Sequence, residues 1–130
     1  MRRSKIAPVR TRILNQTRGN VVCEDAAVAA GMLSRMRGLL GRAELAPGAG
    51  MLFRGEPSIH SAFMRFDFDA IFLDGDLRVV KLAERVRPWR ALGATRARNV
   101  LEIAAGEIAR LGVQVGDQLA VTEEKADANA

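Results

Sequence analysis

The chain has few of the side chains that usually mark a metal centre, a disulfide framework or a covalent catalyst. It contains one cysteine, one histidine, one tryptophan and no tyrosine. A single cysteine cannot form an internal disulfide, and we interpret Cys23, which lies in an apolar stretch, as a small buried thiol in preference to a catalytic cysteine. Because one histidine and one cysteine leave only carboxylates to complete a metal site, we expect no metal and no cofactor.

Long apolar runs are also missing. No stretch approaches the roughly 18 apolar residues that a membrane-spanning helix needs. The basic N-terminus is not followed by the apolar segment of a signal peptide, because charged and polar residues interrupt the sequence at Arg10, Arg12, Asn15 and Gln16. We therefore expect no transmembrane segment and a cytoplasmic location.

Positive charge is plentiful but unevenly spread. The formal net charge is +5, with six basic side chains and no acid in residues 1–18, and seven basic side chains against Glu84 in residues 78–98. Such clusters can attract phosphates, but aromatic residues make up only 5% of the chain, and Trp89 alone lies in either segment to stack on a base. We interpret both segments as solvated faces and keep nucleic-acid binding as a weaker alternative.

The chain is long enough for one ordinary domain. It has 130 residues, of which 48% are hydrophobic and 27% charged, so it can bury a core without help from disulfides or metals. We predict a basic N-terminal segment at residues 1–8, a single domain at residues 9–122 and a disordered acidic tail at residues 123–130.

Local patterns predict mostly short strands. Alternation over residues 9–15 and an apolar run at 21–23 indicate a hairpin that turns near Gly19. A second hairpin joins residues 69–73 to 78–82 through Asp74, Gly75 and Asp76. Further strands are predicted at 51–53, 100–104 and 118–121, and residues 88–95 are expected to form a loop.

Two helical segments complete the prediction. Apolar residues near the 3.6-residue period, with Asp25 as a cap, predict the main helix over about 25–38, and residues 107–111 predict a short helical turn. The expected fold class is mainly β, an α+β domain with few helices: a compact β-barrel or sandwich of about seven short strands, one main helix and one short helical turn.

The chemistry is concentrated in residues 58–74, which hold the only histidine, several phenylalanines and three aspartates. Asp69 alternates with Ile71 and Leu73, so its carboxylate is expected on a buried face, where it needs a cation or several donors. Arg35, on the edge of the predicted helix, and Arg65, four residues away, are the candidate partners. We favour a structural ion pair over an active-site carboxylate, and for Arg35 the alternative is an anion clamp.

His60 is the natural acid–base candidate, because its unperturbed pKa lies near neutral pH. No serine or cysteine lies in a recognised nucleophile motif, and Ser58 and Ser61 are too close to His60 to form a triad with it. Glu102, on a predicted apolar strand, could oppose His60 or an arginine, or form a pair of carboxylates with Asp69.

These residues together resemble the DUF192 (UPF0127-like) family, a domain family of unknown function, here as a cytoplasmic-type member without a signal peptide. The resemblance runs from about residue 14 to residue 121, through the segments 35–42, 50–53, 59–74 and 100–106, and the later pair Gly116 and Asp117. It implies a single small β-rich domain without an established activity.

Carried over position by position, the resemblance implies that Arg35, Met64, Asp69, Glu102 and Gly106 are positions to test. This chain departs from the family's frequent Trp-Met-Lys-Asn-Thr segment, since Phe66 follows Arg65 and no Asn-Thr pair is present. A ligand inferred from that branch of the family would therefore not transfer to this chain.

Three classes of function follow from these observations. The leading one is a non-enzymatic binding or accessory module, whose partner is a small polar ligand or a protein. The second is a hydrolase-like enzyme that uses His60 with Asp69 or Glu102, and the third is a nucleic-acid-associated protein. An exposed strand edge could also form a homodimer. The candidate pocket consists of Arg35, His60, Met64, Arg65, Asp69 and Glu102.

Overall fold

A computed structural model describes residues 9–30, 45–60, 66–88 and 90–125 of the protein. These residues form ten strands and one helix, in the order β1 (Val9–Asn15), β2 (Asn20–Cys23), β3 (Asp25–Ala30), β4 (Ala49–Arg54), β5 (Ser58–His60), β6 (Phe68–Leu73), β7 (Val79–Val86), β8 (Ala91–Gly93), β9 (Asn99–Ala104), α2 (Glu107–Leu111) and β10 (Leu119–Lys125). The expected mainly β, α+β fold class is confirmed.

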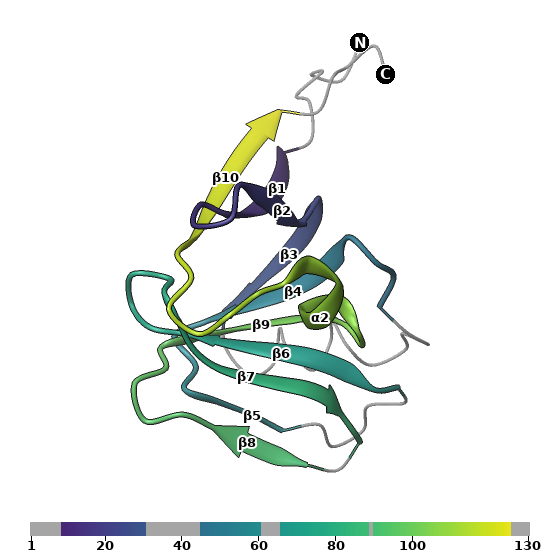
Figure 1. The fold of residues 1–130 in the computed structure, drawn as a ribbon, viewed down its shortest axis with the longest axis vertical. Coiled ribbons are helices and arrows are strands. Elements are labelled where there is room, and N and C mark those ends of the chain that lie inside the picture. Colours follow the sequence, from purple (N-terminus) through teal and green to yellow (C-terminus); the bar gives the residue numbers. More distant parts are fainter. Residues whose placement is uncertain (1–8, 31–44, 61–65, 89, 126–130) are drawn as a thin grey trace, which may run out of the picture.

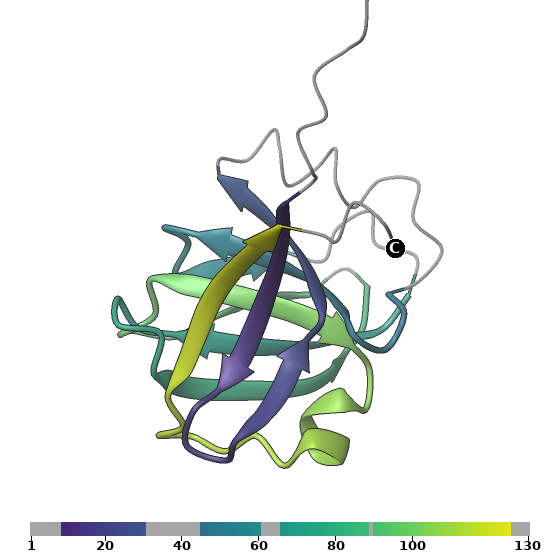
Figure 2. The same cartoon turned by 90° about the horizontal axis from the view of Figure 1, so that it is seen from above.

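The strands form three sheets in layers (Figure 1). A five-stranded sheet in the order β3-β4-β9-β6-β7 lies in the middle. The three-stranded sheet β10-β1-β2 and helix α2 lie on one side of it, and a two-stranded ribbon of β5 and β8 lies on the other. Figure 2 shows β10, β1 and β2 crossing the central strands. Among the strands that the structure describes, no sheet closes on itself as a barrel.

Each face of the central sheet has its own apolar core. On the side of β1, β2 and β10, the core includes Ile71, Leu101 and Ile103 with Val22, Cys23 and Leu119. On the ribbon side, it includes Phe53, Phe68 and Phe72 with Ile59 from β5. Alternate residues of β6 therefore supply both cores, as the two-residue period of a strand requires. All six residues of β6 and all six of β9 are buried, which is expected for strands covered on both faces.

Both predicted hairpins are confirmed. β1 pairs with β2 in antiparallel fashion, and the turn between them contains Gly19 with a φ of 73°. β6 pairs with β7 across a turn in which Oδ1 of Asp74 accepts the backbone N–H groups of Asp76 and Arg78, each at 2.9 Å. A short aspartate side chain that satisfies turn amides in this way explains why the local sequence was sufficient to predict the turn.

The predicted main helix at 25–38 is wrong over its first six residues. Residues 25–30 form β3, which pairs in parallel with β4, and Asp25 opposes Ala49 in the sheet and caps no helix. The alanine-rich sequence favours a helix locally, but pairing with a strand more than twenty residues later outweighs that preference. Residues 31–38 lie outside the described part of the chain.

Two other segments differ from the prediction. Residues 88–95, expected as a loop, contain β8, which pairs with the unpredicted strand β5. β10 continues to Lys125, opposite Val9, so residues 123–125 belong to a sheet and not to a disordered tail. Residues 1–8 and 126–130 lie outside the described residues. No helix within the described ranges has the length and apolarity that a membrane crossing requires.

Candidate functional site

The segment 58–74 does not form one continuous strand. Ser58–His60 is β5 in the ribbon, whereas Phe68–Leu73 is β6 in the central sheet. The backbone of His60 pairs with Ala91 of β8. Three of the predicted pocket residues, Arg35, Met64 and Arg65, lie outside the described residues, so the described side chains that bear on the site are those of Asp69 and Glu102.

Asp69 is fully buried in β6 and accepts three backbone hydrogen bonds. Its Oδ1 accepts the N–H of Arg85 at 2.8 Å, and its Oδ2 accepts those of Gly106 at 3.1 Å and Ile108 at 2.9 Å. A buried carboxylate that receives several amide donors is well compensated for its lost hydration. Three backbone amides thus meet this carboxylate. The ion pair favoured from the sequence, with Arg35 or Arg65, involves residues outside the described part of the chain and stays a prediction.

These bonds give Asp69 a structural role at two irregular places. Gly106 begins α2 with a φ of 94°, and α2 has no side-chain cap from its own segment, so Asp69 satisfies the first-turn amide of Ile108 from a neighbouring strand. Arg85 has a φ of 53° at a register shift between β6 and β7. Asp69 therefore fixes both the start of α2 and a bulge in the edge strand β7.

Glu102 is equally buried, with 1% of its surface exposed, but its surroundings differ. It lies in β9 and opposes Met51 of β4 on one side and Ala70 of β6 on the other, and Ala70 in turn opposes Ala83 of β7. The flanking rows of the sheet carry Phe53, Phe68 and Phe72. Of the three residues that share this row with Glu102, two are thus alanines, so the sheet itself places little side-chain volume beside this carboxylate.

The sheet register separates the two carboxylates. Asp69 opposes Ile103, whereas Glu102 opposes Ala70, and directly opposed residues share a face of a sheet. Asp69 therefore points to the α2 side and Glu102 to the ribbon side. The predicted two-carboxylate arrangement does not form, because the central sheet lies between the groups.

The ribbon lies on the side of Glu102. Ile59 of β5 packs in the same apolar core as Phe53 and Phe72, and β5 lies against β9, the strand that carries Glu102. Of the two histidine–carboxylate pairs considered from the sequence, His60 with Glu102 thus involves elements on one side of the sheet, whereas His60 with Asp69 would act across it.

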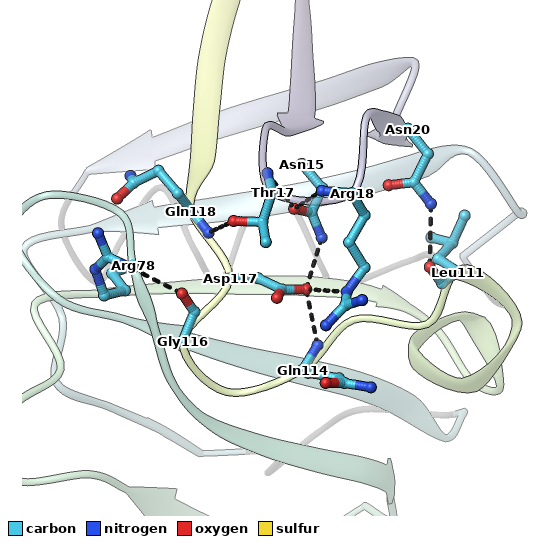
Figure 3. Close-up of polar contacts among 10 residues, drawn as sticks. All are labelled: Asn15, Thr17, Arg18, Asn20, Arg78, Leu111, Gln114, Gly116, Asp117 and Gln118. Carbon is cyan, nitrogen blue, oxygen red and sulfur yellow. Dashed lines mark hydrogen bonds and ion pairs between the residues drawn. The ribbon is translucent and has the colours of Figure 1, made fainter.

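A second buried polar cluster joins the β1–β2 turn to the start of β10 (Figure 3). Oδ2 of Asp117 accepts hydrogen bonds from Nδ2 of Asn15 at 2.9 Å, Nε of Arg18 at 2.7 Å and the backbone N–H of Gln114 at 3.0 Å. Burial raises the pKa of Asp117, but these bonds, with the charge of Arg18, outweigh it and hold the pKa below its ordinary value.

Sequence reasoning missed this cluster. In the sequence, Asp117 stood out only with Gly116 as part of the family resemblance, and Arg18 only as part of a basic segment. The sequence signal for this cluster is the presence of polar residues at two turns. These residues meet only because β1 pairs with β10, which lies more than a hundred residues away in sequence. Because the Asp117 carboxylate accepts three bonds, we interpret the cluster as structural.

The thiol of Cys23 fits the expected buried role. It is fully buried, and burial, with smaller contributions from the charges of Glu107 and Asp25, raises its pKa to about 12. A thiol with so high a pKa is protonated at neutral pH and is a poor nucleophile. A Cβ atom at Gly50 would lie 2.6 Å from the Cys23 sulfur, so the thiol packs directly against a glycine of β4.

The described residues contain no group of three histidine, cysteine, aspartate or glutamate side chains that could hold a metal ion. They contain 13 lysine and arginine and 13 aspartate and glutamate side chains, so the formal excess of +5 comes from the residues outside them. The positive charge of the basic segment 78–98 is thus balanced by acidic side chains elsewhere among the described residues.

The fold defines a small, mainly β α+β domain whose central sheet carries one buried carboxylate on each face, Asp69 on one and Glu102 on the other. A family model for DUF192, described as an uncharacterised group, matches residues 13–121. The chain is 33% identical to a UPF0127 protein of Thermococcus sibiricus over 116 residues, which cover 82% of this chain and 72% of that protein. The chain therefore belongs to the DUF192 family.

Further relatives agree with this assignment. A UPF0127 protein of Pyrococcus furiosus is 33% identical over 114 residues, covering 82% of this chain and 95% of that protein. Among solved structures, a proposed transcription regulator from Sinorhizobium meliloti 1021 is similar with a TM-score of 0.74 and 26% identity, covering 92% of this chain and 98% of that chain. A protein of unknown function from Novosphingobium aromaticivorans has a TM-score of 0.72 and 28% identity, covering 85% and 83%.

Proposed function

We propose that this domain is a non-enzymatic binding module that holds a small polar ligand on the ribbon side of the central sheet, with Glu102 as the group that meets it. The observation that carries the proposal is the position of Glu102: a carboxylate with 1% of its surface exposed, in a row of the sheet shared with Met51, Ala70 and Ala83.

Asp69 shows what a purely structural carboxylate requires in this fold. It is met by three amides that irregular backbone turns toward it. Glu102 lies in the middle of β9, which pairs with β4 and β6 on its two sides, so the amides of these strands are engaged in the sheet. Donors for Glu102 therefore come from outside the backbone of these three strands.

The chemistry of the ligand follows from the carboxylate. Its two oxygens offer about four acceptor positions, which leaves capacity for a ligand beside any side-chain partner. A ligand with an ammonium, guanidinium or other donor group compensates the buried charge best. The proposed further members of the site remain Arg35, His60, Met64 and Arg65. Asp69 is not proposed as a member, because it lies on the opposite face of the sheet from Glu102.

A screen of the purified chain by thermal shift tests the proposal, because a ligand that binds only the folded state raises the melting temperature. The screen covers primary amines, guanidinium compounds, nucleotides, sugars, small acids and metal salts. We expect a stabilising compound with a donor group, whose effect is lost in Glu102→Gln. A compound whose stabilising effect is also lost in His60→Ala, and which the protein converts chemically, would support the hydrolase alternative. Stabilisation that persists in Glu102→Gln would contradict the proposed site.

Nucleic-acid binding is the second candidate, because the structural relative from Sinorhizobium meliloti is described as a proposed transcription regulator. The net positive charge of this chain is consistent with it. The balanced charge of the described residues and the low aromatic content favour the small-ligand module. The cytoplasmic location, a protein partner and a homodimer likewise remain proposals from the sequence, which cell fractionation and light scattering would test.

A further inference from the structure

We propose that the ligand of the Glu102 site is a small zwitterion of the amino-acid type. Its ammonium or guanidinium group meets the carboxylate of Glu102, and its own carboxylate meets the ammonium group of Lys81. This inference rests on the proposed function and names the class of ligand for the same site. It assigns a role to a second charged side chain on the ribbon side of the central sheet.

Lys81 lies on the same face of the central sheet as Glu102. It opposes Phe72 in the pairing of β6 with β7, and Phe72 belongs to the apolar core on the ribbon side. Glu102 opposes Ala70, which belongs to the same core. Because directly opposed residues share a face of a sheet, both charged side chains project toward the layer of β5 and β8 (Figure 1).

The register also gives the separation of the two charged residues. Ala70 of β6 and Ala83 of β7 continue the row of Glu102 across the sheet, and Lys81 lies two residues from Ala83 along β7. With strands about 4.8 Å apart and a rise of about 3.3 Å per residue, the Cα atoms of Glu102 and Lys81 are roughly 12 Å apart. Two long side chains shorten this span, and the row between them contributes only alanines. The remaining distance suits a small molecule that carries a charge at each end.

The charge of Lys81 is not neutralised by a carboxylate among the described residues. Its Nζ donates to the carbonyl of Gly93 in β8 at 2.8 Å and lies 5.4 Å from the centre of the Phe72 ring, and both of these partners are uncharged. An ammonium group has three N–H donors, so the bond to Gly93 leaves two for a ligand. A ligand carboxylate that accepts one of them supplies the opposite charge.

The two ends of the proposed site differ in burial, which sets the orientation of the ligand. Glu102 lies in β9, in the middle of the sheet, and is almost fully buried, whereas Lys81 is half-buried in the edge strand β7. A buried charge gains most from an opposite charge, because water does not compensate it. The cationic group of the ligand therefore occupies the inner end, and its carboxylate occupies the outer end beside Lys81.

Binding of matched pairs of compounds to the full chain tests the proposal. Isothermal titration calorimetry compares the amino acids alanine, lysine and arginine with ethylamine, cadaverine and agmatine, which are the same molecules without the carboxylate. We expect an amino acid to bind about tenfold more tightly than its matched amine. Lys81→Met, which keeps the length of the side chain but removes its charge, should abolish this preference and leave the affinity for the amine unchanged.

The matched control is Arg78→Met, which removes the same charge just before β7, where the side chain of Arg78 donates to the carbonyl of Gly116. It should keep the tenfold preference. Lys81→Gln, which retains a donor for Gly93 without the charge, gives the same test if Lys81→Met does not fold, and it should also lose the preference. An amino acid that binds no more tightly than its amine, or a preference that persists without the charge of Lys81, would overturn the proposal.

Failure of this inference is distinguishable from failure of the proposed function. If an amino acid and its amine bind equally and both are lost in Glu102→Gln, the proposed function stands and Lys81 is not part of the site. If any of these compounds binds unchanged in Glu102→Gln, the proposed site is wrong and this inference falls with it. If none of the six compounds binds, this inference is overturned, and the proposed function depends on the other donors in the thermal-shift screen.

Discussion

At the scale of single residues, the three amide donors around Asp69 make its carboxylate a structural group on the α2 side. Asp69→Asn replaces a charged acceptor by an amide whose NH2 group must face backbone donors. We expect the free energy of unfolding to fall by about 2–4 kcal/mol, measured by urea denaturation. Asp76→Asn, at an exposed turn position, is the control and should change it by less than about 0.5 kcal/mol. A change at Asp69 as small as that of the control would contradict the structural role.

Asp117 gives a prediction about pH. Its pKa in the folded protein lies below the ordinary value of 3.8, so its stabilising bonds are fully present above that value and are lost as the pH falls below it. We expect the stability difference between the native chain and Asp117→Asn to be constant near neutral pH and to shrink as the pH falls below the ordinary value. The stability difference caused by Asp117→Asn should also be smaller when it is measured in an Arg18→Gln background. A difference that stays constant through the acid range would show that Asp117 is not held by this cluster.

At the scale of elements, helix α2 depends on Gly106 and Asp69 together. Gly106 has a φ of 94°, and an added Cβ would lie 3.4 Å from a nitrogen of Arg85. Gly106→Ala should therefore lower the free energy of unfolding by about 1–2 kcal/mol, measured by denaturation. Gly75→Ala, where no positive φ is required and the nearest atom is 3.9 Å away, is the matched control.

A double-mutant cycle with Asp69→Asn extends this test. Since both residues hold the start of α2, their effects should be less than additive by about 0.5–1 kcal/mol. Additive effects would mean that the carboxylate and the glycine stabilise α2 independently.

The elements that could be predicted from the sequence are those specified by adjacent residues. The two hairpins and the short helix have local signals: turn residues near Gly19 and at Asp74, and a helical turn beginning at Glu107. β3 could not be predicted, because its alanines favour a helix and only its parallel pairing with β4 makes it a strand. β5 and β8 are three-residue strands whose pairing joins segments more than thirty residues apart.

The candidate site was predictable only in part for the same reason. The two-residue period correctly placed Asp69 on the face of Ile71 and Leu73. The side on which Glu102 lies follows from its register with Ala70, which no local pattern contains. A shift of one residue in that register would have placed both carboxylates on one face.

At the scale of the whole molecule, the distribution of charge gives a prediction about nucleic acid. The described residues carry no formal net charge, so the formal excess of positive charge that would attract DNA lies in the residues outside them. We expect binding to a fluorescent DNA duplex to be weak, independent of sequence and abolished by about 200 mM salt. Sequence-dependent binding that survives that salt concentration would favour the nucleic-acid alternative over the small-ligand module.

We propose that the two faces of the central sheet have different tasks, with a structural carboxylate on one and a ligand-binding carboxylate on the other. The most direct measurement is the thermal shift produced by the best amine or guanidinium compound in Glu102→Gln and in Asp69→Asn, each compared with its own ligand-free melting temperature. We predict that Asp69→Asn melts at a lower temperature but keeps the ligand-induced shift, whereas Glu102→Gln loses it. A shift retained in Glu102→Gln and lost in Asp69→Asn would contradict the account.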